Sequence, residues 1–203
     1  MKKPAWAPLL ALALLAGACN QTTPAQTATA PASPATAPTV TAVAVAETSA
    51  APETIDYRQI RINGLPFETT TAELLKALGP PDRIKKDAVE CGGHFEFSKG
   101  DHYEYGPSLF EVNGKRAVMG TVDFSSGTFR VTIGGQVLDQ NTTFEEIRQR
   151  YPQAASKVHD WRPGGTTGPT YQGVTIQEPG TDDSLGLYFQ NGKLVRFDAF
   201  SPC

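Results

Sequence analysis

Three histidines and the carboxylates near them are the residues most able to do chemistry in this chain. His94 and His102 lie close in sequence to Asp101 and Glu104, so the two imidazoles could face each other across a hairpin and bind a metal ion together with a carboxylate. Zinc ligands normally have tighter and more convergent spacing, which favours surface histidines on strands or loops, His159 included. We expect no metal site and no other cofactor.

Nucleophilic catalysis has little support in the sequence. A hydrolase that uses a Ser-His-Asp triad on an α/β fold carries its serine in a Gly-x-Ser-x-Gly turn, and the sequence has no such pentapeptide. Residues 181–184, Thr-Asp-Asp-Ser, offer oxygen ligands for a weak calcium site but are more typical of a polar turn. We therefore expect that this protein is not an enzyme.

Four aromatic residues are the candidates for contact with a partner, because aromatic side chains dominate the energetics of interfaces. They are Tyr103, Tyr105, Trp161 and Tyr171. Residues 159–165 (His-Asp-Trp-Arg-Pro-Gly-Gly) predict a loop, and an exposed tryptophan on a loop favours a binding function. The alternative is that Trp161 caps the edge of the core.

Charge and composition limit the kinds of partner. The chain has 203 residues and a formal net charge of −3. Its longest basic run, residues 83–86 (Arg-Ile-Lys-Lys), is typical of a solvated edge or loop. A mildly acidic chain without a cluster of basic residues is a poor candidate for nucleic-acid binding, so we expect no nucleic-acid partner.

Residues 1–18 have the layout of a secretory signal peptide. Lys2 and Lys3 give a positive start, residues 9–15 are apolar, and residues 16–18 are small. The apolar run is too short to cross a bilayer, which takes about 20 residues. We expect this segment to be removed on export.

The end of that segment, residues 15–19 (Leu-Ala-Gly-Ala-Cys), resembles the bacterial lipobox, which implies a lipid-modified Cys19 at the start of the mature chain. Ala16 stands where the lipobox prefers Leu, and ordinary signal peptidase also accepts Ala-Gly-Ala, so a soluble secreted protein is the alternative. Several acyl chains would anchor the protein stably in the cell envelope. Asn20 is not the Asp that retains Gram-negative lipoproteins at the inner membrane, which implies the outer membrane, facing the periplasm. The rule lapses for a Gram-positive organism.

Residues 19–53 form a predicted stalk rich in Thr, Ala and Pro. The segment has no aromatic residue, and its charged residues are Glu47 and Glu53. Such a composition cannot bury enough apolar surface to offset the entropy lost on folding. We expect a disordered stalk between the lipidated cysteine and the folded part.

Two cysteines remain after Cys19. Export places the chain in an oxidising compartment, so Cys91 and Cys203 predict a disulfide that pins the C-terminus to the first half of the folded part. Two free thiols are the alternative. A catalytic thiol is disfavoured, because the sequence has no Cys-x-x-Cys.

The elements that would position these residues follow a repeated pattern. Residues 70–75 (Thr-Thr-Ala-Glu-Leu-Leu) precede Pro80, and residues 142–147 (Thr-Thr-Phe-Glu-Glu-Ile) precede Pro152 at the same spacing. In each segment the first Thr and the Glu three positions later predict a capping box at the start of a helix. The proline then predicts the end of that helix.

Both halves also contain an Asn-Gly-Lys hairpin signal. Asn113-Gly114 and Asn191-Gly192 each follow an apolar strand and predict a type I′ turn, in which both turn residues have positive φ. The helical spacing of three further residues predicts a stripe that faces the core: Phe144, Ile147 and Tyr151. Strands are predicted near residues 57–62, 93–98, 102–111, 116–124, 128–133, 171–178, 184–190 and 193–200.

The predicted fold class is α+β, built from two tandem repeats over residues 54–126 and 127–203. Each repeat is expected to be a short helix or helical pair packed on an antiparallel sheet. The pattern leaves open whether the two repeats share one continuous sheet.

Gly64 and residues 70–81 resemble the opening of the SmpA/OmlA and β-lactamase-inhibitory-protein-like superfamily: a Gly, a Thr/Ser helix cap, an apolar helix and then Leu-Gly-x-Pro. The resemblance covers residues 60–124 best and residues 129–200 more loosely, where Tyr151-Pro152 replaces Leu-Gly-Pro. It implies tandem α+β units whose sheets bind protein partners. Known members include a small lipoprotein of the outer-membrane barrel assembly machinery and secreted enzyme inhibitors. The matching positions are structural, so no binding residue is carried over.

Three functions follow as hypotheses. The first is a protein-binding or scaffold lipoprotein of the cell envelope, with a protein partner that the sequence does not identify. The second is an inhibitor or immunity-type protein that blocks an envelope-acting enzyme. The third is an enzyme or metal-binding protein, which a deep pocket with convergent His94, His102 and carboxylates would favour.

Overall fold

The computed structural model describes residues 53–163 and 167–203. These residues all belong to one compact unit. The predicted signal peptide, Cys19 and the predicted stalk up to residue 52 lie outside the described residues. Within residues 53–163 and 167–203, no helix is long and apolar enough to cross a membrane.

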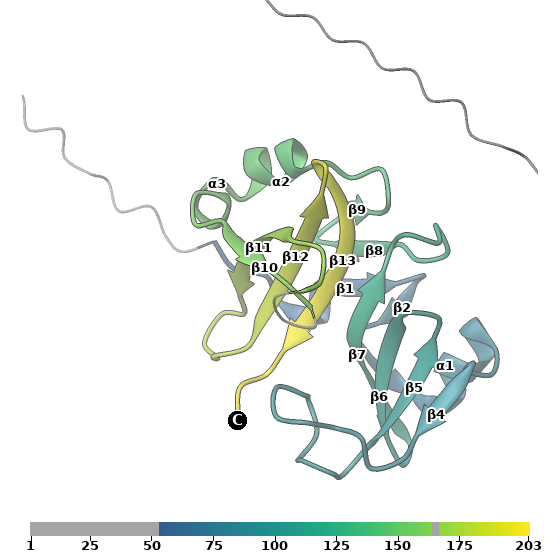
Figure 1. Cartoon of the computed structure of the whole chain (residues 1–203). Coiled ribbons are helices and arrows are strands. Elements are labelled where there is room, and N and C mark those ends of the chain that lie inside the picture. Colours follow the sequence, from purple (N-terminus) through teal and green to yellow (C-terminus); the bar gives the residue numbers. More distant parts are fainter. Residues whose placement is uncertain (1–52, 164–166) are drawn as a thin grey trace, which may run out of the picture. The chain divides into compact units, whose positions relative to one another are not determined.

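The described chain is mixed α and β, with short helices and large antiparallel sheets (Figure 1). The elements before residue 127 are a 3-10 helix (Tyr57–Gln59), β1 (Ile60–Ile62), β2 (Leu65–Pro66), β3 (Glu68–Thr70), α1 (Thr71–Leu78), β4 (Arg83–Lys85), β5 (Asp101–Tyr105), β6 (Ser108–Asn113) and β7 (Arg116–Asp123). Those after it are β8 (Val131–Ile133), β9 (Gln136–Leu138), α2 (Phe144–Arg150), α3 (Pro152–Ala155), β10 (His159–Trp161), β11 (Tyr171–Gln177), β12 (Ser184–Gln190) and β13 (Lys193–Phe200).

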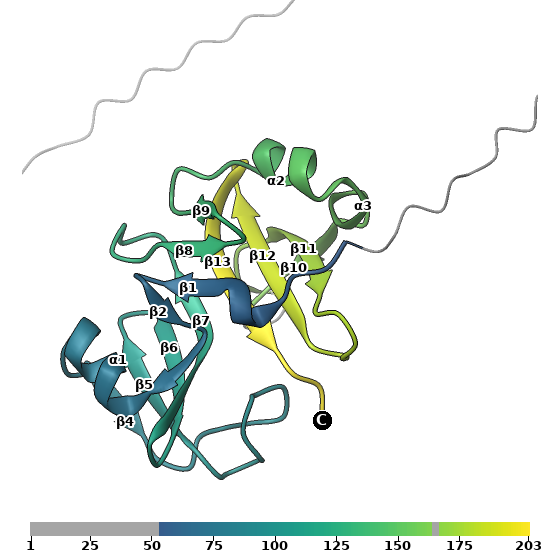
Figure 2. The ribbon, with the colours of Figure 1, turned by 180° about the vertical axis from the view of Figure 1, so that it is seen from behind.

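The large sheet has the strand order β10-β11-β12-β13-β7-β6-β5-β4, and β3 also pairs with β7. Strands β13 and β7 pair directly, with Phe197 opposite Val122, so the two halves of the chain share one continuous sheet. A smaller sheet of order β2-β1-β8-β9 also joins the halves, because β1 pairs with β8 (Figure 2).

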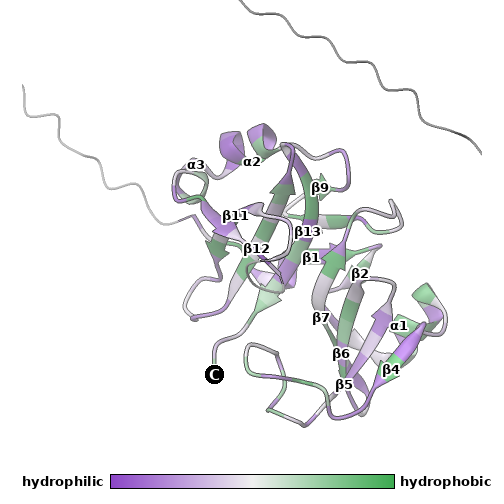
Figure 3. Ribbon diagram, in the orientation of Figure 1, coloured by the Kyte–Doolittle hydropathy of each residue, from purple (hydrophilic) through white to green (hydrophobic). Residues whose placement is uncertain are grey.

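Alternation along the strands gives the large sheet two different faces. On β12, Leu185, Leu187 and Phe189 are buried in the core, whereas Ser184, Gly186 and Tyr188 point to the opposite face. We call this opposite side the open face. Residues paired across strands share a face, so the open face carries Arg83, Lys85, His102, Glu104, Glu111, Thr121, Thr175, Gly186, Tyr188, Arg196 and Asp198. In Figure 3 the hydrophobic colour concentrates on strands such as β12 and β13, and α2 is mostly hydrophilic.

The first predicted helix is confirmed. Thr70 is the N-cap of α1, its hydroxyl accepts from the Glu73 backbone N–H, and the Glu73 carboxylate accepts from the Thr70 backbone N–H. Gly79 ends the helix with a φ of 79°, a conformation that glycine adopts without strain. The Gly-Pro-Pro sequence that follows does not continue the helix.

The second predicted cap is wrong by one residue. The N-cap of α2 is Thr143, whose capping box uses Glu146, not Thr142 with Glu145. The Thr142 hydroxyl instead accepts from the Asp139 backbone N–H at 3.0 Å, in the turn before the helix. Two consecutive threonines followed by two consecutive glutamates made either register possible from sequence.

The predicted end of this helix is confirmed, because α2 ends at Arg150, before Pro152. Pro152 then opens a separate short helix, α3, since a proline is well tolerated at the first helical position. The Glu53 carboxylate accepts from the backbone N–H groups of Gln153 and Ala154, both at 3.0 Å, so the last residue of the predicted stalk belongs to the folded part. The predicted stripe is confirmed: Ile147 and Tyr151 are buried and Phe144 packs on Phe189.

One of the two predicted type I′ turns is present. Asn191 and Gly192 have φ values of 52° and 74° and connect β12 to β13. In the first half, Asn113 pairs with Arg116, so the turn residues are Gly114 and Lys115. Only Gly114 of that pair has a positive φ, which is the pattern of a type II′ turn, and the type I′ prediction is wrong there.

Some predicted strands also need correction. Residues 93–98 form no strand but part of the loop between β4 and β5, where Ser98 has a positive φ. The predicted strand 102–111 is a hairpin, broken by a turn at Gly106-Pro107. The predicted strands do not include β2, β3, β4, β9 and β10, because two or three residues are too few to show alternation. Trp161, expected on a loop, ends edge strand β10.

Candidate functional site

An aromatic cluster lies at one end of the open face. It is formed by His159 and Trp161 of β10, Tyr171 of β11 and Tyr188 of β12. Trp161 stacks on Tyr188, with ring centroids 4.1 Å apart and an interplanar angle of 29°. The Trp161 and Tyr171 rings are 5.6 Å apart, and the Arg196 guanidinium lies 5.0 Å from the centroid of the Trp161 ring. The cluster therefore combines four aromatic rings with one neighbouring cation.

Glycines beneath the rings make this packing possible. A Cβ on Gly186 would lie 2.5 Å from the Tyr188 hydroxyl oxygen, and a Cβ on Gly173 would lie 2.5 Å from Nε2 of His159. Both distances are far below contact, so a larger residue at either position would displace the ring above it. The cluster thus depends on small residues in β11 and β12 as well as on the aromatic residues.

Next to the cluster lies a cavity of about 500 Å³. Its floor comes from both halves of the sheet: Glu111 and Thr121 of β6 and β7, and Tyr188, Arg196 and Asp198 of β12 and β13. The volume is within the range of about 300–1,000 Å³ that is common for ligand sites. The cavity is therefore a concave site at the junction of β7 and β13.

Two carboxylates in this cavity are held by different partners. Arg196 donates through Nε to both oxygens of Asp198, at 2.7 and 2.9 Å. Glu111, only 5% exposed, accepts from the backbone N–H of His94 at 2.7 Å. Burial raises the pKa of both the Asp198 and the Glu111 carboxyl above the ordinary value.

Burial also shifts the neutral titratable groups of the cavity. It raises the pKa of the Tyr188 hydroxyl to about 12, so this hydroxyl is a neutral donor at physiological pH. It lowers the pKa of His102, which pairs across strands with Glu111. Both residues are therefore uncharged neighbours of the two carboxylates near neutral pH.

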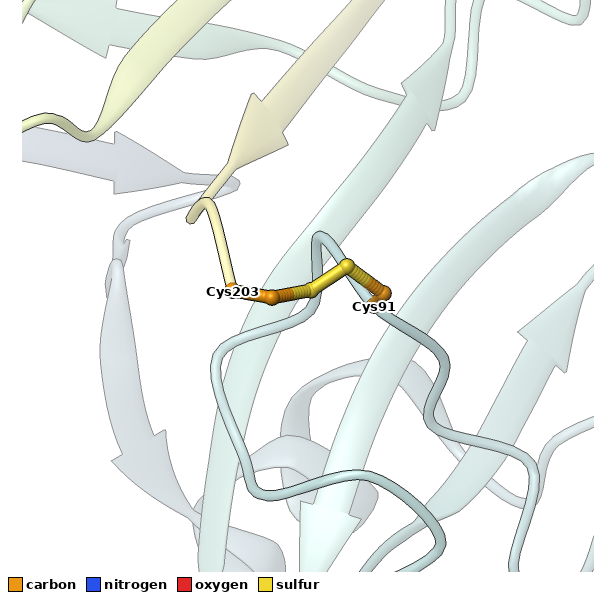
Figure 4. Close-up of a disulfide and its surroundings, with 2 residues drawn as sticks. All are labelled: Cys91 and Cys203. Carbon is orange, nitrogen blue, oxygen red and sulfur yellow. A yellow bond between two sulfur atoms is a disulfide. The ribbon is translucent and has the colours of Figure 1, made fainter.

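The predicted disulfide is present (Figure 4), and its Cys91 lines the cavity. Cys91 and Cys203 have a Cα–Cα distance of 5.6 Å and a sequence separation of 112. Beside this bond, the backbone N–H of Ser201 donates to the carbonyl of Gly92 at 3.0 Å. Together these bonds attach the C-terminal residues to the loop between β4 and β5, whose residues Cys91 and Gly92 line the cavity.

The four predicted binding residues do not form one group. Trp161 and Tyr171 are directly opposite each other in the pairing of β10 and β11. Tyr103 and Tyr105 pack against the core, and the Tyr105 hydroxyl donates to the Gly79 carbonyl at 3.1 Å. Tyr188 was missed, although its alternation with buried Leu187 and Phe189 could have placed it opposite the core.

The structure separates the histidines of the metal hypothesis. The His94 ring packs edge-on against Phe67 at 5.2 Å and Tyr57 at 6.0 Å, whereas His102 lines the cavity on the open face. In residues 53–163 and 167–203, no group of three or more His, Cys, Asp or Glu side chains is placed to hold a metal ion. Asp183 lies in a polar turn, where its backbone N–H donates to the Thr181 hydroxyl.

Comparisons of this chain with protein-family models, with curated proteins and with solved structures found no match.

Proposed function

We propose that this chain is a lipid-anchored, non-enzymatic protein of the cell envelope that binds a protein partner through the open face of its large sheet. The aromatic cluster of His159, Trp161, Tyr171 and Tyr188 beside the cavity is the observation that carries the proposal. Tryptophan, tyrosine and arginine are the residue types most enriched in the energetic centres of interfaces. Here they occur together on a face that the core does not use.

The packing of the cluster supports binding with little loss of conformational entropy. Trp161 is already stacked on Tyr188, and the Arg196 guanidinium is already fixed by Asp198 and by the Thr121 hydroxyl at 3.2 Å. Side chains that are ordered before association do not have to be ordered by the partner. A preorganised surface of this kind suits specific association with a protein.

The two halves of the folded part are, in this proposal, tandem repeats of one α+β unit. Counted inward from the two edges, the strands run β4-β5-β6-β7 and β10-β11-β12-β13, and they meet at β7 and β13. The N-cap threonines Thr70 and Thr143 pair with Arg116 and Lys193, the first residues of those two central strands. The resulting face spans both repeats, which gives a larger surface than either repeat alone.

The anchor proposed for this surface is a lipidated Cys19 followed by the stalk, at the periplasmic side of the outer membrane in a Gram-negative organism. Intact mass of the protein from native membranes tests it. We expect the mass of a chain that begins at Cys19 and carries acyl chains. The mass of an unmodified chain would remove the anchor from the proposal.

Crosslinking in native envelopes tests the binding surface. We expect the wild-type chain to capture a discrete protein partner, the Trp161→Ala variant to lose it, and Gln149→Ala, on the exposed side of α2, to retain it. Capture that is the same for all three chains, or absent for all, would overturn the proposal. A partner that is an envelope enzyme and loses activity on 1:1 binding would make the protein an inhibitor.

A further inference from the structure

The cavity at the junction of β7 and β13 contains more negative than positive charge. Its lining includes the carboxylates Glu90, Glu111 and Asp198, against the single guanidinium of Arg196 among the residues described. Arg196 is committed to Asp198 through two hydrogen bonds. Within the described chain, no ion pair is formed by Glu111, so its charge is balanced only by backbone N–H groups.

The position of Glu111 directs this charge into the cavity. A Cβ placed on Gly120 would lie 3.7 Å from a Glu111 carboxylate oxygen, so the carboxylate reaches over β7, toward the junction with β13. Leu109 borders the same space, with its Cγ 3.5 Å from that Cβ position, and a Cβ on Gly93 of the β4–β5 loop would lie 2.7 Å from the same Glu111 oxygen. A buried carboxylate without a cation is unfavourable, and a cation entering the cavity would stabilise it.

The aromatic wall of the cavity also favours a bound cation. Trp161 and Tyr188 line the cavity, and the face of Trp161 already attracts the Arg196 guanidinium. Aromatic faces attract cations through their quadrupole, most strongly where water is excluded. Carboxylates and aromatic faces together favour lysine or arginine over acidic or neutral groups.

We propose that the cavity receives a lysine or arginine side chain from the protein partner, with Glu111 and Asp198 as acceptors and Trp161 and Tyr188 as the aromatic wall. This inference rests on the proposed function and specifies the chemistry of the partner: a basic residue that projects from its surface. Partner and cavity would then form a charge pair that is shielded from water at the centre of the interface, where electrostatic complementarity contributes most to specificity.

Short peptides test the inference without knowledge of the partner. Trp6 lies in the predicted signal peptide, so the mature chain that begins at Cys19 has Trp161 as its single tryptophan. The probes are acetyl-Gly-Arg-Gly-amide and acetyl-Gly-Lys-Gly-amide, with the neutral citrulline peptide and the Glu peptide as comparisons. We expect saturable changes of Trp161 fluorescence with the Arg and Lys peptides, and at least about tenfold weaker binding of the other two. Equal binding of the citrulline peptide, or no saturable change with any peptide, would overturn the inference.

Two variants identify the acceptors. Glu111→Gln keeps an oxygen for the His94 N–H, and Asp198→Asn removes one charge; each should weaken binding of the Arg peptide about tenfold. The matched control is Glu104→Gln, which lies on the same face but outside the cavity, where Arg83 and Lys85 bind Glu104. Unchanged affinity for the Arg peptide in both cavity variants would overturn the inference. If either variant is unstable, the comparison of the four peptides on the wild-type protein tests the inference instead. If partner capture requires Trp161 but the Arg and citrulline peptides bind equally well, this inference is wrong. The proposed function would still be supported.

Discussion

Each end of the open face is an antiparallel strand pair, but the two ends differ in chemistry. At the β4–β5 end, Glu104 lies between Arg83 and Lys85, with contacts of 2.6 and 2.8 Å. At the β10–β11 end, the corresponding strands carry Trp161 opposite Tyr171. Charged edge strands protect a sheet against unwanted pairing with other chains, and aromatic residues favour contact. The core residues form the scaffold in both halves, whereas the residues of the open face differ between its two ends. In the proposed function, the aromatic β10–β11 end is the one that binds the partner.

The largest effect on the free energy of unfolding is expected from removal of the disulfide that links the two halves. Replacing both Cys91 and Cys203 by Ser releases a loop of 112 residues. We expect the free energy of unfolding to fall by about 4 kcal/mol, since a closed loop of this length restricts the unfolded chain strongly. Denaturant unfolding measures it, and the wild-type chain under reductant serves as the control that should show the same shift. An unchanged midpoint would mean that the disulfide does not tie the halves together.

The next largest effect is expected from core substitutions in the two helices α1 and α2. Leu74 and Ile147 each occupy the fourth position after the N-cap threonine, and both are 0% exposed. Substitution of either by Ala should cost about 3 kcal/mol, because each leaves a cavity in the core. Hydrogen exchange of the β6 and β12 amides reports on the halves separately, and both should lose protection in either variant. Loss in one half alone would show that the halves unfold independently.

Once the partner is isolated, substitutions at the two ends of the open face should have different effects on the binding affinity. Trp161→Ala should weaken association by about 2 kcal/mol, as for a central aromatic contact. Arg83→Ala, at the charged end, should change it by less than about 0.5 kcal/mol, because an exposed ion pair contributes little. Titration calorimetry gives both values. A larger loss for Arg83→Ala would reverse the roles that we give to the two ends.

Smaller effects are expected at the helix caps. Thr70→Ala and Thr143→Ala should each cost about 1 kcal/mol, because each leaves a backbone N–H at a helix start without its acceptor. Amide exchange at Glu146 should accelerate in Thr143→Ala and stay unchanged in Thr142→Ala. Faster exchange in Thr142→Ala and unchanged exchange in Thr143→Ala would show that Thr142 is the N-cap of α2.

The smallest effect is a pH dependence of opposite sign at the cavity and at the charged end. Burial raises the pKa of Glu111, so its ionisation destabilises the folded chain as pH rises from the ordinary carboxyl pKa through the raised one. Hydrogen bonding to Lys85 and Arg83 lowers the pKa of Glu104, so its stabilisation is present above the ordinary pKa and is lost as pH falls through the lowered one. Relative to wild type, Glu111→Gln should therefore gain stability and Glu104→Gln should lose it between about pH 4 and about pH 8. Thermal midpoints measure both, and shifts of the same sign would contradict these assignments.

Local patterns in the sequence predicted much of the scaffold. The alternation of apolar residues gave the bounds of β12 and β13, Thr70 and Glu73 gave the start of α1, and the even pair of cysteines gave the disulfide. Each of these signals is encoded within a few residues or by residue type alone.

The site was harder to predict because it depends on long-range pairing. The junction of β7 with β13 joins Thr121 to Asp198, and no local pattern encodes that register. Strand β10 has only three residues, so the sequence around Trp161 predicts a loop. Tyr103 and Tyr105 have the right residue type but pack against the core, which only the register of β5 reveals.

Site-specific photo-crosslinking in native envelopes tests the central claim, that the open face binds a protein, most directly. A photoreactive phenylalanine replaces Thr175, which is exposed at the cavity, or Val137, which is 52% exposed on β9 of the smaller sheet. We predict a discrete protein adduct from position 175 and none from position 137. Adducts from position 137 alone, or from neither position, would contradict the claim.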